Sequence, residues 1–190
     1  MDYEEKFRSQ VSSSKVGKNK EIKDALSLRR AVTDAERWKR QPGSQKIWLI
    51  SDRYKVADDN GGAFFRYKCS FEHPDIKVYF VIDKDSPDFE RLSEIGNVVA
   101  QDSREHRVLH MLADCIVSSQ ADEYIWDPLW REGQARQLFK DYYARQKFVF
   151  LQHGVIKDDL SRWLNRRNKN IDGFYLHAGE LSDLVSDCLV

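Results

Sequence analysis

The chain has 190 residues, of which 41% are apolar and 12% aromatic, enough to form the core of one domain. Its 31 Lys and Arg residues equal its 31 Asp and Glu residues, so the overall charge does not indicate a nucleic acid partner. The three cysteines are scattered and form no CxxC pair, which suits a reducing compartment and predicts neither a zinc site nor a disulfide framework.

The N-terminal segment differs from the rest in composition. Residues 1–20 are polar, which predicts a mobile tail, and they lack the apolar core of a signal peptide. Apolar residues recur at helical spacing over 21–40, and the Pro and Gly before residue 44 end that helix. We expect the 21–43 segment to pack on the domain. Membrane contact is the alternative, since residues 1–40 hold eleven Lys or Arg against seven Asp or Glu.

From residue 44 to 190, short apolar segments alternate with amphipathic ones. Strands are predicted at 46–51, 76–83, 97–100, 115–119, 147–152 and 171–176. Helices are predicted between them, at 63–71, 87–95, 104–112, 134–144 and 159–167. This alternation predicts an α/β domain, a Rossmann-like parallel sheet with helices on both faces.

The fifth predicted strand ends in the most informative residues of the chain. Residues 147–152 are followed by His153 and Gly154, at the carboxyl end of a buried strand, where open α/β sheets bind their ligands. Gly154 permits a sharp turn. The pKa of an unperturbed histidine, about 6.5, suits proton transfer, so we predict a catalytic role for His153.

The loop after the first predicted strand is the second candidate site. Its polar residues lead into a helix that opens with Gly61, so they are expected to face the same carboxyl-end crevice. Arg53 is a candidate phosphate ligand, and Asp59 and Asn60 are candidates for orienting hydroxyl groups. A turn that only caps the helix is the alternative.

Two further patterns suggest metal ligands. Asp83 and Asp85 resemble the DxD site of some nucleotide-sugar transferases. His106 and His110 lie one helical turn apart, but the segment lacks the glutamate of HExxH, and we expect a solvent-facing pair. The sequence therefore predicts no metal site.

Other familiar motifs are missing or ambiguous. The sequence has no GxGxxG, no GxxxxGK[ST] and no GxSxG, so a dinucleotide site, a P-loop and a nucleophile elbow are unsupported. Tyr124, Trp126 and Trp130 lie in the connection after the fourth strand. They are expected either to line a ligand cleft or to cover the edge of the sheet.

Five segments of the chain, taken in order, have a recognisable pattern. They are KIWLISDR, DNGGAFFRY, HPDIKVYFVIDKDSPDFERL, SSQADE and KFVFLQHGVIKDDLSRWLNRRNKNID, spread over residues 46–172. Together they resemble the CDP-glycerol:poly(glycerophosphate) glycerophosphotransferase family, the wall teichoic acid polymerases and their relatives in capsule synthesis. The sequence departs from the family pattern at Gly62, where an acidic residue is common, and at Gln120, where a histidine is common.

The resemblance implies a GT-B-type architecture of two Rossmann-like halves, of which this chain would be the acceptor-side half, truncated before the donor-binding domain. An acceptor hydroxyl would attack the β-phosphorus of CDP-glycerol and release CMP, with His153 as general base. The reaction needs CDP-glycerol as donor substrate and no metal or other cofactor. The substrate-binding residues implied are Arg53, Asp59, Asn60, Gly61, Gly154 and Lys157.

The partners expected are a polyol-phosphate or lipid-linked acceptor, and either a separate donor domain or a further copy of the chain. The resemblance implies a cytoplasmic protein, peripheral on the inner face of the cell membrane. The short chain is expected to have little activity alone. Two other functions stay open, a non-catalytic module that binds a polyol-phosphate polymer or a partner donor half, and a metal-dependent nucleotide-sugar transferase that uses Asp83 and Asp85.

Overall fold

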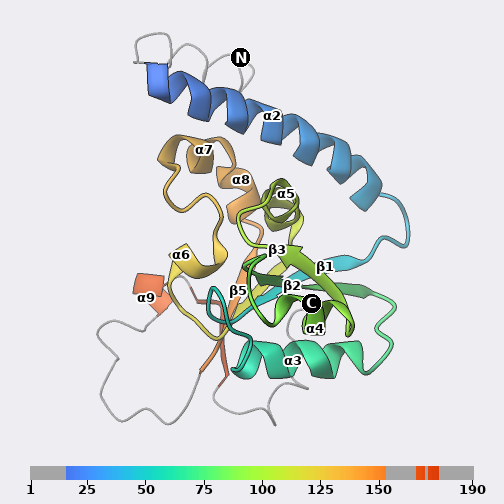
Figure 1. Ribbon diagram of the computed structural model, residues 1–190. Coiled ribbons are helices and arrows are strands. Elements are labelled where there is room, and N and C mark those ends of the chain that lie inside the picture. The colour runs from blue at the N-terminus through green and yellow to red at the C-terminus, as the bar shows by residue number, and fades with distance from the viewer. Residues whose placement is uncertain (1–15, 153–165, 170, 176–190) are drawn as a thin grey trace.

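The structure, a computed structural model, describes residues 16–152, 166–169 and 171–175. In this part of the chain six strands form one parallel sheet in the order β3-β2-β1-β4-β5-β6 (Figure 1). They are β1 (Lys46–Ser51), β2 (Ile76–Ile82), β3 (Asn97–Ala100), β4 (Cys115–Ser118), β5 (Lys147–Leu151) and β6 (Gly173–Tyr175). This is the doubly wound order, and the connections reverse direction between β1 and β4. The predicted fold class is confirmed.

The helices mostly follow the predicted pattern. They are α2 (Val16–Lys39), α3 (Asn60–Cys69), α4 (Phe89–Ser93), α5 (Arg104–Leu112), α6 (Glu123–Trp126), α7 (Gly133–Leu138), α8 (Lys140–Tyr143) and α9 (Arg166–Lys169). The helix predicted over 134–144 is two short helices that meet at Phe139. The helix α2 begins within the tail predicted for residues 1–20, so that boundary is wrong. Most of the helix predicted over 159–167 lies outside the described residues.

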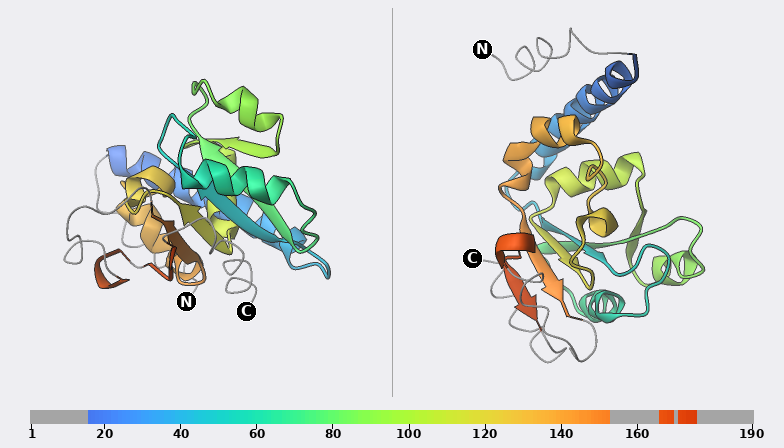
Figure 2. Two further views of the ribbon diagram at one scale, coloured as in Figure 1. Left: turned by 90° about the horizontal axis from the view of Figure 1, so that it is seen from below. Right: turned by 90° about the vertical axis from the view of Figure 1, so that its left-hand side faces the viewer.

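Each face of the sheet is covered by a separate set of helices. On one face, Trp48 and Phe80 pack against Phe64 and Phe65 of α3 and Leu92 of α4, all fully buried. In the right-hand view of Figure 2, α3 and α4 lie on one side of the sheet, while α2, α7 and α8 lie on the other. Successive side chains of a strand point to opposite faces of the sheet. A strand that is apolar throughout therefore contributes to the apolar cores on both faces.

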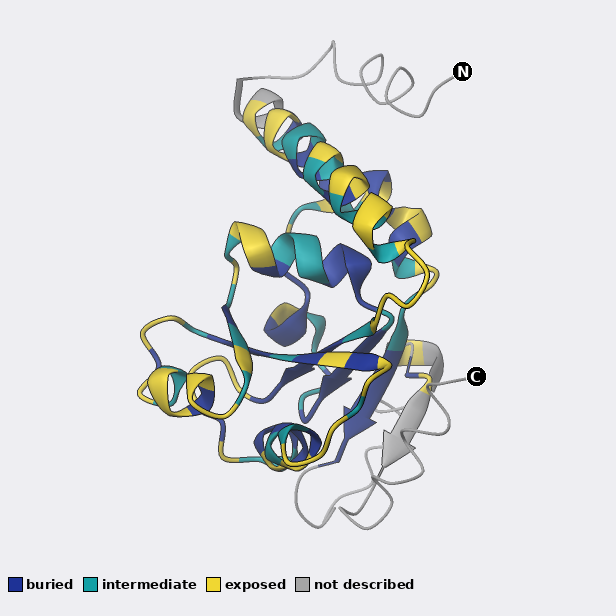
Figure 3. Cartoon of the chain, turned by 90° about the vertical axis from the view of Figure 1, so that its right-hand side faces the viewer, coloured by how far each residue is buried: buried dark blue, intermediate teal, exposed yellow. Residues whose placement is uncertain are grey.

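The helix α2 forms an outer layer over α5, α7 and α8. Its buried stripe, Ile22, Ala25, Leu28 and Val32, shares one apolar cluster with residues of these helices. Lys39 pairs with Asp114 at 2.7 Å and anchors the end of the helix. Packing on the domain is confirmed, and exposed residues line the outer side of α2 (Figure 3). None of the helices in the described residues has the length and apolar character needed to cross a membrane.

Candidate functional site

The loop at the carboxyl end of β1 is organised around Asp52. This residue is fully buried, and its carboxylate accepts hydrogen bonds from the amides of Gly61 and Gly62, each at 2.8 Å. Burial raises the pKa of Asp52, and a hydrogen bond from Ser119 and the helix amides act in the opposite direction. Rossmann folds that bind dinucleotides use such amides for the pyrophosphate. Here the amides at the start of α3 already bind a carboxylate of the protein.

Gly61 and Gly62 allow α3 to approach β1 this closely. A Cβ atom at Gly61 would lie 2.3 Å from Oδ1 of Asp52 and 2.6 Å from the carbonyl oxygen of Ser51. A Cβ at Gly62 would lie 2.7 Å from the carbonyl oxygen of Ala57. An acidic side chain at position 62, which the resemblance would lead one to expect, therefore has no room here. In this structure Gly61 therefore allows the backbone of α3 to pack closely against the end of β1.

Asp59 and Asn60 connect this loop to the end of β5. Asp59 caps α3 by accepting a hydrogen bond from the amide of Asn60 at 2.8 Å. The side-chain amide of Asn60 donates to the carbonyl oxygen of Gln152, which directly precedes His153 in the sequence. The loop after β1 and the end of β5 are therefore in contact, and both side chains have structural partners there.

A row of buried serines marks the switch point between β1 and β4. The hydroxyl groups of Ser51 and Ser118 lie 3.0 Å apart, and the amide of Ser119 donates to the carbonyl oxygen of Ser51 at 3.2 Å. The amide of Gln120 donates to the hydroxyl oxygen of Ser118 at 3.0 Å. These residues and Asp52 were not among the predicted site residues. The signal that could have found them is the change from apolar to polar residues as each strand ends.

The other predicted site residues are only partly described. Arg53 is exposed on the loop after β1, and its backbone forms an isolated antiparallel bridge with Val56. His153, Gly154 and Lys157 lie outside the described residues.

The solvent-facing pair predicted for His106 and His110 is wrong, because both side chains are fully buried. The segment 123–143 covers this side of α5, and Trp126 and Tyr143 pack against His110. Burial lowers the pKa of His106 well below its usual value and that of His110 to about 3, with further lowering of the latter by Arg136.

Neither pair of residues that suggested metal ligands belongs to a larger group of candidate ligands in the described part of the chain. Among the described residues, no three His, Cys, Asp or Glu side chains gather as metal ligands. Asp83, which was considered with Asp85 as a metal ligand, accepts a hydrogen bond from the amide of Asp85 at 2.7 Å. This carboxylate therefore stabilises the turn after β2.

The three aromatic residues after β4 serve both of the predicted purposes. Trp126 is buried and stacks on Phe148 of β5 with ring centroids 4.6 Å apart. Tyr124 and Trp130 are exposed, and they line an open cavity of about 520 Å³. One residue therefore covers the sheet and the other two line a cavity.

These features define a Rossmann-like α/β protein with buried polar residues at the carboxyl ends of its central strands. The chain is similar to the minor teichoic acid biosynthesis protein GgaB of Bacillus subtilis (strain 168), with 36% identity over 151 residues. The match covers 79% of this chain and 16% of GgaB, so the chain spans a small part of that protein. No family model matches the chain, and no solved structure matches it.

Proposed function

We propose that the chain is the acceptor-side domain of a transferase that makes teichoic acid or a related cell-surface polymer. In this proposal glycerol phosphate passes from CDP-glycerol to a polyol-phosphate or lipid-linked acceptor. The 36% identity to GgaB carries the proposal, together with the contact between α3 and the end of β5. A lipid-linked acceptor would bring the protein to the inner face of the cell membrane as a peripheral protein.

The proposed chemistry is one substitution at phosphorus. The acceptor hydroxyl oxygen attacks the β-phosphorus of CDP-glycerol, the bond to the CMP oxygen breaks, and CMP leaves. His153 takes the proton of the attacking hydroxyl, a contribution of about 10²–10⁴-fold in rate for a general base. Lys157 offsets negative charge on the transferred phosphate, and the exposed Arg53 contacts a phosphate of the acceptor. The donor half would come from a further domain or a partner.

Asn60 has a positioning role in this scheme. Its side chain holds the carbonyl group of Gln152, and so fixes the backbone one residue before the proposed base. Asp52 stabilises this arrangement, because its carboxylate accepts hydrogen bonds from the first amides of α3. The residue that precedes the proposed base is thereby held by both β5 and α3, which would favour alignment of the base.

A binding module is the second candidate, and the structure gives a specific reason to consider it. The amides at the start of α3 bind Asp52, so they are not available to a nucleotide phosphate. A domain of this kind would hold a polyol-phosphate polymer and leave nucleotide binding and transfer to other parts of a larger protein.

A chimera tests the proposed function. The matched segment of GgaB is replaced by the corresponding residues of this chain, and transfer is measured from labelled CDP-glycerol to a lipid-linked glycerol-phosphate acceptor. We expect transfer that falls about 10²–10⁴-fold in His153→Ala, with unchanged acceptor binding. The substitution Trp38→Ala, on the exposed side of α2, is the control. If His153→Ala transfers at the unsubstituted rate, His153 is not the base. If the chimera binds the acceptor but transfers nothing, the binding module is favoured.

A further inference from the structure

A cavity lies near the edge of the sheet at which the parallel strands have their carboxyl ends. Three connections meet there, the loops after β1 and β3 and the segment 124–132 after β4. The cavity has a volume of about 520 Å³, and we call it the aromatic pocket. Its aromatic and charged lining residues are Tyr54, Asp102, Arg107, Tyr124, Trp130, Arg131 and Glu132.

We propose that the aromatic pocket binds a sugar ring that carries a phosphate group, as one unit of the acceptor. The inference rests on the proposed function for the source of the ligand, but the pocket itself is argued from its own side chains. A sugar ring presents an apolar face of C–H groups and an edge of hydroxyl groups. The pocket offers aromatic rings to the apolar face, a carboxylate to the hydroxyl groups and guanidinium groups to the phosphate.

The aromatic rings are accessible to a ligand. The exposed fractions of Tyr54, Tyr124 and Trp130 are 37%, 51% and 39%, so part of each side chain is in contact with solvent. Tyr124 and Trp130 lie beside each other with centroids 5.8 Å apart. Large rings that are half buried around a concave site are a common feature of ligand pockets.

Asp102 is held in an unusual backbone conformation at the edge of the pocket. Its φ of 58° lies in the left-handed region, which costs free energy for a residue other than glycine. The amide of Asp102 donates to Nδ1 of His106 at 3.1 Å, and its Oδ2 accepts from the hydroxyl of Tyr54 at 3.1 Å. Because burial keeps His106 neutral, Nδ1 remains an acceptor. The protein therefore holds a carboxylate, an acceptor of hydroxyl protons, beside the aromatic rings.

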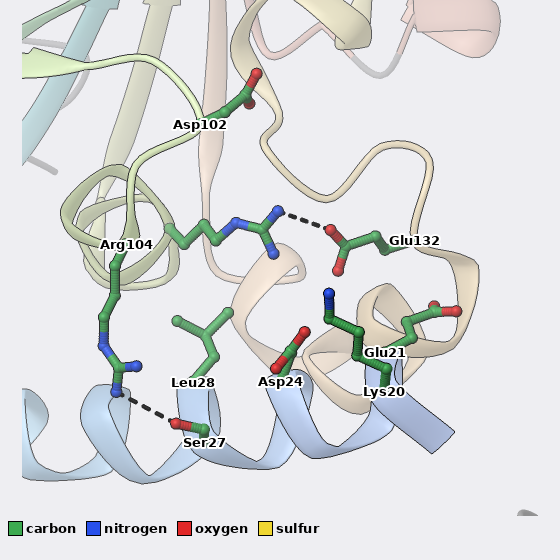
Figure 4. Close-up of a pocket in the computed structure, with 9 residues that line it drawn as sticks. Lys20, Glu21, Asp24, Ser27, Leu28, Asp102, Arg104 and Glu132 are labelled. Atoms are coloured by element: carbon green, nitrogen blue, oxygen red, sulfur yellow. Dashed lines mark hydrogen bonds and ion pairs between the residues drawn. The ribbon is translucent and has the colours of Figure 1, made fainter. Parts of the chain in front are cut away.

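The cationic side of the pocket is also fixed by neighbours. Arg107 pairs with Glu132 at 2.7 Å, and the guanidinium of Arg131 lies 4.7 Å from the ring centroid of Trp130. Figure 4 shows the adjoining cavity under α2, which shares Asp102, Arg107 and Glu132, with the carboxylate of Asp102 pointing away from α2. Guanidinium groups suit the oxygen atoms of a phosphate because they donate in a planar fork.

Hydrogen bonds and an ion pair to neighbouring residues stabilise the segment that carries Tyr124 and Trp130. The carboxylate of Asp127 accepts from the amide of Leu129 and from the hydroxyl of Tyr143, each at 2.8 Å. Arg136 pairs with Glu123 at 2.8 Å. The pocket is therefore largely formed before a ligand arrives, which reduces the entropy lost on binding.

The test measures binding to the full chain without donor or transfer. Glucose 1-phosphate, glycerol 3-phosphate and CMP are titrated while the indole N–H signals are followed by NMR, with the Trp130 signal assigned from Trp130→Phe. We expect glucose 1-phosphate to shift the Trp130 signal and to bind about tenfold more tightly than glycerol 3-phosphate, which lacks a ring face. Trp130→Ala should weaken binding about tenfold, and Trp38→Ala should leave it unchanged.

Asp102→Gly gives a variant in which the fold is expected to be kept, because glycine adopts a φ of 58° without strain. We expect this variant to bind glucose 1-phosphate more weakly. Equal binding of both phosphates, tighter binding of CMP, or a Trp130 signal that does not move would each overturn the proposal. The assay uses neither CDP-glycerol nor His153, so its failure is distinct from failure of the proposed transfer.

Discussion

The side-chain amide of Asn60 donates to the backbone carbonyl of Gln152, and this bond joins residues 92 positions apart in the sequence. It connects the first turn of α3 to the last residue before His153. Both elements lie beside the switch point of the sheet, where this fold class places its ligands. The bond therefore connects α3 to the residue that precedes the proposed base in the sequence.

Asn60→Ala should lower transfer because it frees the carbonyl of Gln152 and with it the position of His153. We expect kcat in the chimera to fall by about 10–10²-fold with little change in KM, as for other losses of alignment. The control is Asn97→Ala, since the amide of Asn97 likewise donates to a backbone carbonyl, that of Val78, at 3.1 Å. Equal effects of the two substitutions on kcat would mean that Asn60 only stabilises the fold.

Gly61→Ala should destabilise the protein by about 1–3 kcal/mol, the usual cost of forcing extra volume into a packed site. The added Cβ meets the carboxylate of Asp52 and the carbonyl of Ser51, and the backbone atom cannot rotate away. Gly133→Ala is the matched control, because no atom lies within 4 Å of its added Cβ. It should leave stability unchanged or raise it by up to about 1 kcal/mol. Urea unfolding of both variants tests this, and a neutral Gly61→Ala would show that α3 can move away from β1.

The strands and most helices could be predicted from the sequence because their signals are local. Each strand is an apolar segment bounded by turn residues, and Asp59 before α3 is a recognisable cap. The role of Asp52 could not be found in this way. Its bonds to the amides of Gly61 and Gly62 depend on how closely α3 approaches β1.

His106 was misplaced for a related reason. The spacing of residues along α5 says which side chains share a face, but not that the segment 123–143 covers that face. The position of the loop after β1 at the carboxyl ends of the strands could be predicted from the topology, whereas the aromatic pocket depends on three separate connections. Such a pocket leaves no fixed spacing in the sequence.

Lys68→Met should stabilise the protein by about 1 kcal/mol at pH 7, because it removes a buried amine for which the structure shows no hydrogen-bond partner. Burial lowers the pKa of Lys68 to about 8, and the only compensation described is the ring of Trp48, 5.2 Å from Nζ. Lys77→Met is the matched control, since the amine of Lys77 lies over Tyr79 at 5.4 Å but its residue is exposed. Urea unfolding gives the comparison.

The same substitution has a second, independent signature. The unfolded chain holds the Lys68 proton up to its usual pKa of 10.5, while the folded chain releases it near 8. The stability of the unsubstituted protein should therefore rise between pH 8 and 10.5 through this residue. Lys68→Met should lack that part of the rise. If Lys68→Met is less stable than the unsubstituted protein at pH 7, the contact of the amine with Trp48 outweighs the cost of burying it.

His106 and His110 should make the protein less stable as the pH falls through the ordinary histidine range. Both are neutral in the folded state because burial lowers their pKa, that of His110 to about 3, whereas the unfolded chain takes up protons near pH 6.5. The contribution of these residues to the free energy of unfolding is therefore present above about pH 6.5 and is lost as the pH falls below it. Between pH 7.5 and 6.0 the loss amounts to about 0.8 kcal/mol for each histidine.

His106→Asn isolates this effect, because the amide oxygen of asparagine can replace Nδ1 as the acceptor for the amide of Asp102. The variant should lose about 0.8 kcal/mol less stability than the unsubstituted protein between pH 7.5 and 6.0, measured by urea unfolding at both values. His110→Gln should give a similar reduction. If neither substitution alters the pH dependence, these side chains are protonated in the folded protein, and Nδ1 of His106 then no longer holds Asp102 in its left-handed conformation.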